Sequence, residues 1–535
     1  MTALTERIAA ILAEFDRPGS PGGVVGVSLR GTMLHRSGFG LASVEHGVAN
    51  SAQTVMPIGS VTKQFTCAAV LLLAEDAVLD LDDPIACWLP ELREDQRLPT
   101  LRQLMHHTAG VRCYLDHVIF SDYVAFPPGA AEALQCRQHD LNFQPGHGAS
   151  YSNGGYLLLS LAVERASGMS FERFLETRLF TPLDMRSTSL RKRPWPVQRG
   201  VASTYMACDG GWRPGMTLTE DFLGDGGMVS TVDDLLRWAT HLRRGQGVVS
   251  LGTMSTPAIL ADGSSSNYGF GLIRETWRGA TTVQHAGGLP GASAAFIMFP
   301  DDDLDIVVAF NRNAPATELG LRIAEEILGS RLAPPPPTPR SEAYAGLLGS
   351  WIAEDTNLVF SFVDLDGALG LSLFGAPGFP LEAREASHGV LPLYADVGIG
   401  EMRFREVTDP ASRPAFIEYC DAGTWRTARR ISAMTPSARD TLLPSGTFIN
   451  DALQASLRFD VEEGRMVMRT RGAHGIATCL AEPIGKDLIR FWSKRWPGGM
   501  LARLVHRDGQ VAAVTIATTR TPSTTFLRSG IAASP

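Results

Sequence analysis

Lysine is the scarcest charged residue of this 535-residue chain. Only four of its 48 basic residues are lysines, namely Lys63, Lys192, Lys486 and Lys494, and the rest are arginines. The formal net charge is −8, so the chain lacks the basic excess that nucleic-acid binding requires. No segment reaches the roughly 18 consecutive apolar residues of a membrane helix. We therefore expect neither nucleic acid nor a membrane as a partner.

Metal-binding and disulfide motifs are also missing. The sequence has no His-Glu-x-x-His segment and no Cys/His array, so we expect no metal and no cofactor. The seven cysteines include no Cys-x-x-Cys pair, which is typical of reduced thiols in a cytoplasm. Residues 1–16 carry acids within an apolar stretch, which predicts an amphipathic helix rather than a secretory signal. We expect a cytoplasmic protein.

One of the rare lysines stands at the start of a long apolar run. Ser60 and Lys63 directly precede residues 64–74, which are mostly apolar and predict a buried helix. Residues three apart lie on the same face of a helix, so a hydroxyl and an amine are brought together. A buried lysine loses its proton far more readily than arginine, and a neighbouring base makes a serine nucleophilic.

The same spacing also occurs by chance in this chain. Ser189 and Lys192 are three residues apart, but Arg193 and Pro194 follow them and no apolar helix does. That segment predicts a solvated loop. The signal at Ser60 therefore comes from the spacing together with the buried helix that it opens.

The first three fifths of the chain mix helices and strands. Apolar patterns predict strands over 23–29, 294–299 and 304–310, and helices over 64–76, 155–167, 171–178, 232–243 and 317–331. Strands at both ends with helices between them favour an antiparallel sheet flanked by helices. We assign residues 1–333 to this α+β domain and residues 334–339, which are rich in proline, to an extended linker.

The remainder predicts short strands and contains an internal repeat. Glycines at 349, 367 and 375 recur 97 residues later at 446, 464 and 472. The apolar phase between them is kept, which favours a duplication. We predict two small antiparallel β-barrels, over 340–435 and 436–535, because closure removes exposed strand edges.

Two further patches of the first domain carry reactive side chains. Tyr151 and Asn153 lie between a glycine-rich loop and an apolar helix. His285 precedes Gly287, Gly288 and a predicted strand. Alone, such a tyrosine is more often a packing residue and such a histidine a turn residue.

The Ser60/Lys63 pair, the Tyr151/Asn153 pair and His285 with its glycines follow one another along the chain. In this order they resemble the motifs of the serine penicillin-recognising family. That family includes class C β-lactamases, D-Ala-D-Ala carboxypeptidases, esterases and aminopeptidases. The segments 104–110 and 226–234 are similar to two further stretches of it. The whole layout resembles the bacterial D-aminopeptidases, which release an N-terminal D-residue, preferably D-alanine. The resemblance implies a β-lactamase/transpeptidase-like domain followed by two eight-stranded, lipocalin-like barrels, and it suggests a homodimer.

The resemblance also implies residue roles. Ser60 would be the nucleophile, with Lys63, Tyr151 and His285 as the other catalytic residues. The substrate-binding groups would be Asn153 for the substrate amide and the backbone N–H of Gly288, which forms the oxyanion site with that of Ser60. His285 stands where β-lactamases and carboxypeptidases commonly carry lysine, which disfavours β-lactam hydrolysis.

Physical chemistry leaves the proton acceptor open. A lysine cation about 4 Å away lowers the pKa of a phenol by about three units at an effective dielectric of about 20. Tyr151 can then take the Ser60 proton while Lys63 assists it and His285 orients it. The reverse assignment, with Lys63 as base and Tyr151 as acid, fits the sequence nearly as well.

Two predictions concern the free amine of the substrate. Asp225 is a candidate anion for the substrate ammonium, although such a residue is more often a solvated loop acid. By resemblance, a loop near 471–482, which includes His474, enters the catalytic cleft and excludes longer substrates. The partner is thus a small peptide, amide or ester with a free N-terminal D-residue. The alternatives are an esterase or D,D-carboxypeptidase of the same superfamily, and a non-catalytic protein that binds peptidoglycan fragments.

Overall fold

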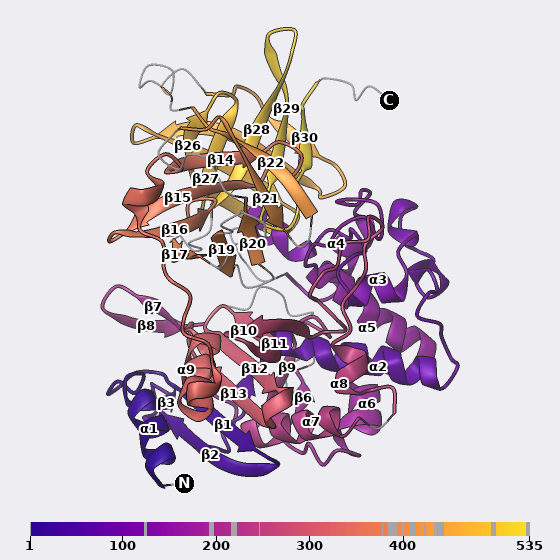
Figure 1. Ribbon diagram of the computed structural model, residues 1–535. Helices are drawn as coiled ribbons and strands as arrows, with labels where there is room; N and C mark the ends of the chain where they lie inside the picture. The colour runs from indigo at the N-terminus through magenta and orange to yellow at the C-terminus, as the bar shows by residue number, and fades with distance from the viewer. Residues whose placement is uncertain are drawn as a thin grey trace. The chain divides into compact units, whose positions relative to one another are not determined.

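The computed structural model divides the chain into two compact units. Unit 1 comprises Met1–Val111, Ala125–Ala133 and Pro145–Pro334, and unit 2 comprises Arg112–Val124, Leu134–Gln144 and Pro335–Pro535 (Figure 1). The structure describes residues 2–121, 126–191, 197–215, 222–245, 247–376, 378–383, 393–396, 401–405, 413–421, 424–432, 434, 443–493 and 499–530.

Unit 1 is built on a six-stranded antiparallel sheet in the order β10-β11-β12-β13-β1-β2. Its strands are β1 (Gly23–Leu29), β2 (Thr32–Phe39), β10 (Ile273–Trp277), β11 (Ala280–Leu289), β12 (Ala292–Phe299) and β13 (Leu304–Phe310). The short strands of this unit are β3 (Leu41–Ser43), β4 (Val48–Ala49), β5 (Met56–Pro57), β6 (Ser189–Leu190), β7 (Tyr205–Cys208), β8 (Gly211–Pro214) and β9 (Met228–Ser230).

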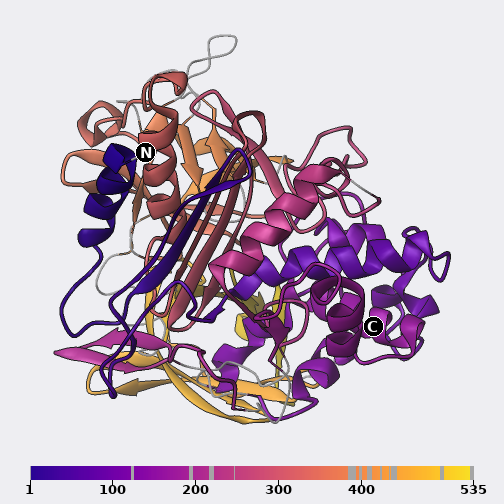
Figure 2. The same cartoon turned by 90° about the horizontal axis from the view of Figure 1, so that it is seen from below.

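Helices cover both faces of this sheet. The longer helices are α1 (Thr2–Ala13), α2 (Lys63–Glu75), α5 (Asn153–Ser167), α7 (Val232–Arg244) and α9 (Ala316–Leu328). The shorter ones are α3 (Leu101–Met105), α4 (Ala130–Arg137), α6 (Phe171–Leu175) and α8 (Leu251–Met254). Helices α1 and α9 pack on one face and α7 on the other, as the view from below shows (Figure 2).

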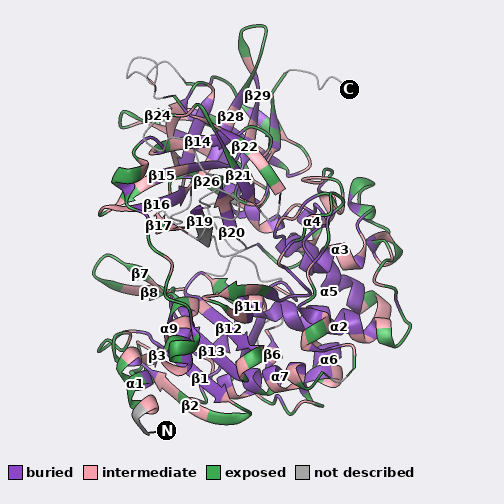
Figure 3. Cartoon of the chain, in the orientation of Figure 1, coloured by how far each residue is buried: buried purple, intermediate pink, exposed green. Residues whose placement is uncertain are grey.

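The middle of the sheet is buried because its strands are apolar on both faces. Every residue of β13 is buried, and the strand appears purple throughout in Figure 3. Alternate residues such as Val25, Ile297 and Val308 form one cluster with residues of α1 and α9. On the opposite face Gly26 lies so close to Val232 of α7 that an added Cβ would come within 2.8 Å of its Cβ.

The predicted elements of the first domain are present with small shifts. Helix α5 begins at Asn153, because the Ser152 hydroxyl caps it by accepting the Gly155 N–H at 3.2 Å. Gly168, in the left-handed conformation, ends it. Within the described residues, no helix is long and apolar enough to cross a membrane.

Unit 2 contains two antiparallel sheets of successive strands. Eight strands close into a barrel, β23 (Phe448–Asn450), β24 (Ala455–Glu462), β25 (Arg465–Gly472), β26 (Gly475–Gly485), β27 (Leu488–Trp492), β28 (Gly499–Arg507), β29 (Gln510–Ala517) and β30 (Thr524–Arg528). The other sheet has nine strands, β14 (Gly349–Ala353), β15 (Val359–Leu365), β16 (Ala368–Leu373), β17 (Phe379–Pro380), β18 (Glu382–Ala383), β19 (Leu393–Asp396), β20 (Glu401–Phe404), β21 (Phe416–Asp421) and β22 (Thr424–Arg430).

The barrel predicted over 436–535 is thus observed, whereas closure of the 340–435 sheet is not. Only Leu381 separates β17 from β18, which are the two ends of the nine-stranded sheet. No ladder joins these two ends in the part of the chain that the structure describes. A second complete barrel therefore stays a prediction.

The internal repeat is visible in the strand register. Phe362 pairs with Leu371 across β15 and β16, and Phe459 pairs with Met468 across β24 and β25. Both partners are displaced by 97 residues, as in the sequence. The two hairpins therefore share one register, which is what a duplication predicts.

The segment 471–482 differs from the predicted loop. Strand β25 continues to Gly472 and β26 begins at Gly475, so only Ala473 and His474 form the turn between them. Gly472 pairs with Gly475 across this turn. The prediction of a loop was wrong because the turn signals here belong to a tight hairpin.

Two segments from the middle of the first predicted domain belong to unit 2. The 3-10 helix Tyr114–Ser121 carries Asp116, which is buried and accepts hydrogen bonds from Thr518 at 2.6 Å and Thr521 at 2.7 Å. The Thr470 hydroxyl donates to the Phe120 carbonyl oxygen at 3.1 Å. The predicted domain boundary at residue 333 therefore does not separate the two units.

Candidate active site

Ser60 lies in a 3-10 turn over Gly59–Thr62 that leads directly into α2. The serine is partly exposed, whereas Lys63 is fully buried. The Lys63 ammonium nitrogen Nζ lies 3.1 Å from Ser60 Oγ. The hydroxyl and the amine predicted to meet are therefore in hydrogen-bond contact.

Lys63 Nζ has two further oxygen partners. It donates to Asn153 Oδ1 at 2.7 Å and to the Asp225 carbonyl oxygen at 2.5 Å. A protonated lysine has three N–H donors for the three oxygens. A neutral amine would keep two donors for the two carbonyl oxygens and present its lone pair to Ser60 Oγ. The arrangement thus accommodates Lys63 both before and after it takes a proton.

Aromatic rings enclose the lysine. Nζ lies 4.7 Å from the ring centroid of Tyr151 and 5.3 Å from that of Tyr156. The negative face of an aromatic ring attracts a cation, so both rings offset part of the cost of burying Lys63. Tyr156 follows Asn153 by one helical turn of α5 and therefore lies on the same face of that helix.

His107 lies at the centre of the tyrosines around the site. Its ring centroid is 4.2 Å from that of Tyr151, 4.9 Å from Tyr156 and 4.6 Å from Tyr268. Its Nδ1 accepts the backbone N–H of Ser152 at 3.2 Å, and its backbone adopts a positive φ of 60°. The segment 104–110, which resembles a stretch of the family, thus packs the His107 ring against Tyr151.

His285 lies on the side of β11 that faces α2. It pairs with Phe296, whose neighbours Ala295 and Ile297 face α1 and α9 instead. Burial, reinforced by the Lys63 charge, lowers the pKa of His285 from 6.5 to about 3. The histidine is therefore neutral at neutral pH.

The strand edge beside Ser60 is held by close backbone packing. A Cβ on Gly287 would lie 1.9 Å from the Ile58 carbonyl oxygen and 3.3 Å from the Ser60 nitrogen. A Cβ on Gly59 would lie 2.8 Å from the Gly288 nitrogen. Only glycine permits this approach, which places the backbone nitrogens of Ser60 and Gly288 close to each other.

An extended ligand can lie along this edge. Strand β10 pairs with β11 only over Ala280–Gln284, so residues 285–289 have β12 on one side and no partner strand on the other among the described strands. Such an edge offers main-chain donors and acceptors to a peptide.

Asp225 is buried rather than solvated, with 1% of its surface exposed. Its Oδ1 accepts the Leu223 N–H at 3.0 Å, while its carbonyl oxygen accepts from Lys63. The carboxylate thus shapes the turn that presents this carbonyl. The residue predicted as the ammonium partner therefore also holds Lys63 through its backbone.

A small cavity of about 70 Å³ lies between the turn after Asp225 and the end of β11. Its walls are mostly apolar. They are formed by Pro57, Arg191, Thr204, Phe222, Gly226, Gly227, Met228, Val229, Leu289 and Pro290.

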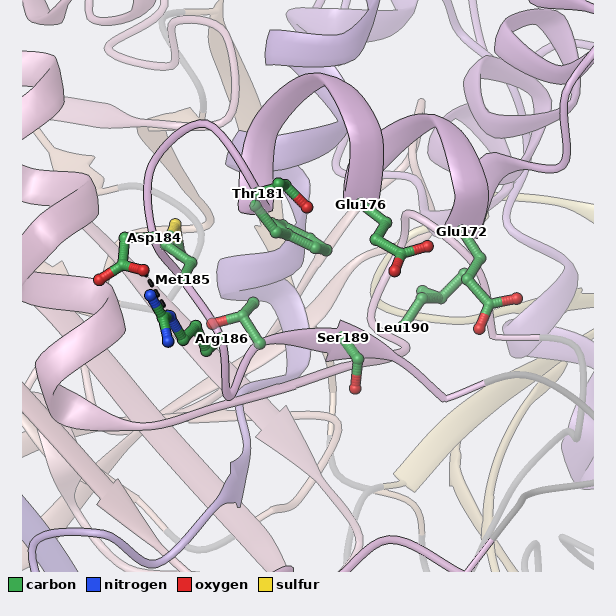
Figure 4. A pocket seen from close by; sticks show the side chains of 10 residues that line it. Glu172, Glu176, Thr181, Asp184, Met185, Arg186, Ser189 and Leu190 are labelled. Atoms are coloured by element: carbon green, nitrogen blue, oxygen red, sulfur yellow. Dashed lines mark hydrogen bonds and ion pairs between the residues drawn. The ribbon is translucent and has the colours of Figure 1, made fainter.

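A second cavity, of about 500 Å³, lies elsewhere in unit 1 and contains none of the predicted site residues. Figure 4 shows its acidic side chains Glu172 and Glu176, and the ion pair of Asp184 with Arg186 at 2.5 Å. Across the described ranges, no group of three or more His, Cys, Asp or Glu side chains could hold a metal ion.

The predicted residues Ser60, Lys63, Tyr151, Asn153, His285, Gly288 and Asp225 all belong to unit 1. The contacts above place most of them beside Lys63 or beside the backbone nitrogen of Gly288. His474 lies in unit 2, where burial and the Arg137 charge lower its pKa. Its role in the site stays a prediction.

Sequence reasoning missed His107 as a support, and it missed Tyr156 and Tyr268 entirely. Tyr156 had a signal, because it shares a helix face with Asn153. Tyr268 had none, because it precedes β10 in an irregular segment.

The fold and the site together define a serine hydrolase. A serine at a helix start contacts a buried lysine and faces a strand edge with backbone N–H groups, an arrangement suited to acyl transfer.

Known proteins agree with this class. The family model described as Beta-lactamase matches residues 8–328. The D-aminopeptidase of Brucella canis is 30% identical over 369 residues, which cover 66% of this chain and 68% of that protein. The D-aminopeptidase of Gluconobacter oxydans is 27% identical over 415 residues, which cover 76% and 75%. A structure described as SurE with D-Leu is 27% identical, with a TM-score of 0.52, and covers 81% of this chain and 100% of its own.

The chain belongs to the β-lactamase family of serine hydrolases, and the resemblance predicted from its motifs is confirmed.

Proposed function

We propose that this enzyme releases an N-terminal D-amino acid from peptides, amides and esters. The observation that carries the proposal is the contact of buried Lys63 with Ser60 Oγ, opposite the Gly288 edge of β11. The similarity to D-aminopeptidases over two thirds of the chain supports a D-residue as the substrate. The small, mostly apolar cavity beside Leu289 supports a small side chain such as that of D-alanine.

The first half of the reaction forms an ester on Ser60. Ser60 Oγ attacks the substrate carbonyl carbon while its proton passes to neutral Lys63. The oxyanion is stabilised by the backbone N–H groups of Ser60 and Gly288, and the Asn153 side chain contacts the substrate amide. The C–N bond then breaks, and the amine leaves with a proton from Tyr151.

In the second half, water attacks the ester carbonyl and returns the serine. The Tyr151 phenolate takes a proton from this water, the C–O bond to Ser60 breaks as Lys63 returns its proton to Ser60 Oγ, and the D-amino acid is released. The 3.1 Å contact between Lys63 and Ser60 supports Lys63 as the base. Tyr151, whose ring face lies toward Lys63, is then the acid.

An aminopeptidase must also bind a free ammonium. We propose the Asp225 carboxylate for this role, because it is buried beside the Lys63 contact. The hairpin 471–482, with His474 at its turn, is proposed to exclude longer N-terminal extensions. We also propose that the protein is a homodimer. The molar mass measured by light scattering tests this.

Three substrates test the proposal. We expect fast release of p-nitroaniline from D-alanine p-nitroanilide, slow release from the L isomer and very slow release from the N-acetylated D compound. Equal rates with the acetylated compound would contradict an aminopeptidase and favour an esterase or a D,D-carboxypeptidase. Absence of any turnover would favour a non-catalytic binder of peptidoglycan fragments.

The Ser60→Ala variant identifies the nucleophile. We expect turnover to fall to the background rate while the circular dichroism spectrum and the melting temperature stay those of the unchanged protein. Substantial residual turnover would mean that another serine is acylated.

A further inference from the structure

We propose that Tyr268 is a positioning residue that holds His285 as a neutral imidazole with its proton on Nδ1. The inference rests on the proposed function for its catalytic meaning, but its structural content can be tested separately. Tyr268 comes from the irregular segment before β10, and His285 comes from β11.

The two ring nitrogens of His285 have different partners. Nδ1 lies 2.6 Å from the Ala286 carbonyl oxygen. A carbonyl oxygen can only accept, so Nδ1 must carry a proton. Nε2 lies 2.9 Å from the Tyr268 hydroxyl, which donates to it when the imidazole is neutral. The partners therefore select one of the two neutral tautomers.

The surroundings keep the pair in place. Tyr268 is 4% exposed and His285 is also 4% exposed. The ring of Tyr268 contacts His107 at 4.6 Å and Tyr151 at 6.1 Å between centroids. The charged or titratable groups around the pair are Lys63 beside His285, and Tyr151, Tyr156, Cys67 and His107 beside Tyr268. A second proton on His285 would be buried without water to solvate it, and it would face a cation whenever Lys63 holds a proton.

The consequence concerns the strand edge as well as the ring. Because His285 Nδ1 donates to the Ala286 carbonyl oxygen, the orientation of the ring is tied to the peptide that precedes Gly287. Gly287 packs on Ile58, and Gly288 supplies the second oxyanion N–H. Tyr268 thus fixes the part of β11 that must match the substrate, and His285 takes no proton from Ser60.

Nitrogen-15 NMR of histidine-labelled protein tests this directly. The His285 signals are assigned by their loss in a His285→Gln variant. We expect the unchanged protein to show a protonated Nδ1 and an unprotonated Nε2 from pH 5 to 8, with no titration. An Nε2–H tautomer, or titration within that range, would overturn the inference without any variant of Tyr268.

The Tyr268→Phe variant removes only the hydroxyl. We expect a mixture of tautomers at His285, because the ring loses its Nε2 partner, while burial still keeps its pKa low. At neutral pH kcat should fall about 10- to 100-fold, as expected when a site loses its alignment, with KM changed less than about threefold.

The matched control is Tyr205→Phe. Tyr205 is also buried, and its hydroxyl is hydrogen-bonded to Glu45 and to the Val44 N–H, away from His285. This variant should leave the His285 signals and kcat unchanged. If Tyr268→Phe likewise leaves both unchanged, Tyr268 has no positioning role. If the unchanged protein hydrolyses none of the substrates, the proposed function fails while the NMR result still decides the tautomer.

Discussion

At the scale of single residues, Lys63 links most of the site. It is fully buried and contacts Ser60, Asn153 and the Asp225 carbonyl oxygen. A buried charge persists only when its partners compensate for lost water, and the aromatic rings of Tyr151 and Tyr156 add to that compensation.

Replacing Lys63 by methionine keeps the length of the side chain and removes its donors. Two carbonyl oxygens then lose a buried partner, so we expect the free energy of unfolding to fall by about 1–3 kcal/mol. We expect kcat to fall about 10²- to 10⁴-fold, as when a general base is lost. Urea unfolding and D-alanine p-nitroanilide turnover measure the two effects. Lys486→Met, at an exposed turn, is the control and should change neither.

His106 supplies a prediction about pH. It is buried, its Nδ1 donates to the Tyr268 carbonyl oxygen at 3.1 Å, and burial lowers its pKa from 6.5 to about 4. Between these values the unfolded chain binds a proton and the folded protein does not. The contribution is therefore complete above pH 6.5 and is lost as the pH falls toward 4, by about 3 kcal/mol in total.

The His106→Asn variant keeps a donor near the same place and cannot titrate. We expect its unfolding free energy to fall less steeply between pH 6.5 and 4 than that of the unchanged protein, as measured by urea unfolding at several pH values. His46→Asn, at an exposed turn, should keep the original slope. Parallel slopes for all three proteins would show that His106 is not the group that titrates.

The sequence could predict Ser60, Lys63, Tyr151, Asn153 and His285 because each stands beside a helix start or strand with a recognisable pattern. The partner of His285 could not be predicted. Tyr268 has no periodic context, and its approach to Nε2 depends on how β10 returns to β11. The neutral state of His285 likewise follows from burial, which a sequence does not display.

At the scale of elements, the approach of β11 to the Ser60 turn places the backbone nitrogens of Ser60 and Gly288 where we propose that they bind the oxyanion. Neither element has a side chain at the contact, because Gly59 and Gly287 meet backbone atoms. The glycines are visible in the sequence. The contact that requires them joins two segments that lie far apart in the chain, so the sequence does not show it.

We expect Gly287→Ala to separate β11 from this turn. The new Cβ would start 1.9 Å from the Ile58 carbonyl oxygen, so the backbone must move. Overpacking of this kind costs about 1–3 kcal/mol, and misplacing the Gly288 N–H should lower kcat about 100-fold. Thermal unfolding measures the loss of stability, and turnover of D-alanine p-nitroanilide measures the fall in kcat. Gly252→Ala, in α8 with open space around it, is the control; equal effects from both changes would contradict the contact.

Periodicity placed helices α2, α5, α7 and α9 within two residues at their starts and within three at their ends. At 471–482 the resemblance suggested a loop, and the structure has a long β-hairpin with a two-residue turn. Glycine and polar residues mark both kinds of structure, and the pairing of Arg469 with Thr478 that distinguishes them is a cross-strand contact.

At the scale of the whole molecule, the repeat was predictable because equal spacing survives in the sequence. The division into units was not. Segments Arg112–Val124 and Leu134–Gln144 belong to unit 2, although a pattern along the chain places them within the first domain. Their partners lie more than 300 residues away, as in the bond of Thr518 to Asp116.

We therefore expect a chain that ends at Pro334 to fold less stably than the full protein. It keeps the 3-10 helix at Tyr114–Ser121 but loses Thr470, Thr518, Thr521 and Phe526, the last of which packs on Phe120 at 5.2 Å between centroids. The buried Asp116 carboxylate would lose both hydroxyl donors, and a buried polar group without partners is costly. We expect a lower melting temperature, binding of a hydrophobic dye and little turnover.

The full chain with Asp116→Ala separates this cause from a general effect of truncation. It removes the acceptor of both threonines and should lower the free energy of unfolding by about 1–3 kcal/mol, measured by urea unfolding, while the dye stays unbound. Asp140→Ala, whose exposed carboxylate pairs with Arg112 at 3.1 Å, is the control and should cost less than about 1 kcal/mol. If the chain ending at Pro334 melts as a single cooperative unit at the temperature of the full protein, the two segments fold without unit 2, and the boundary at residue 333 is a true domain boundary.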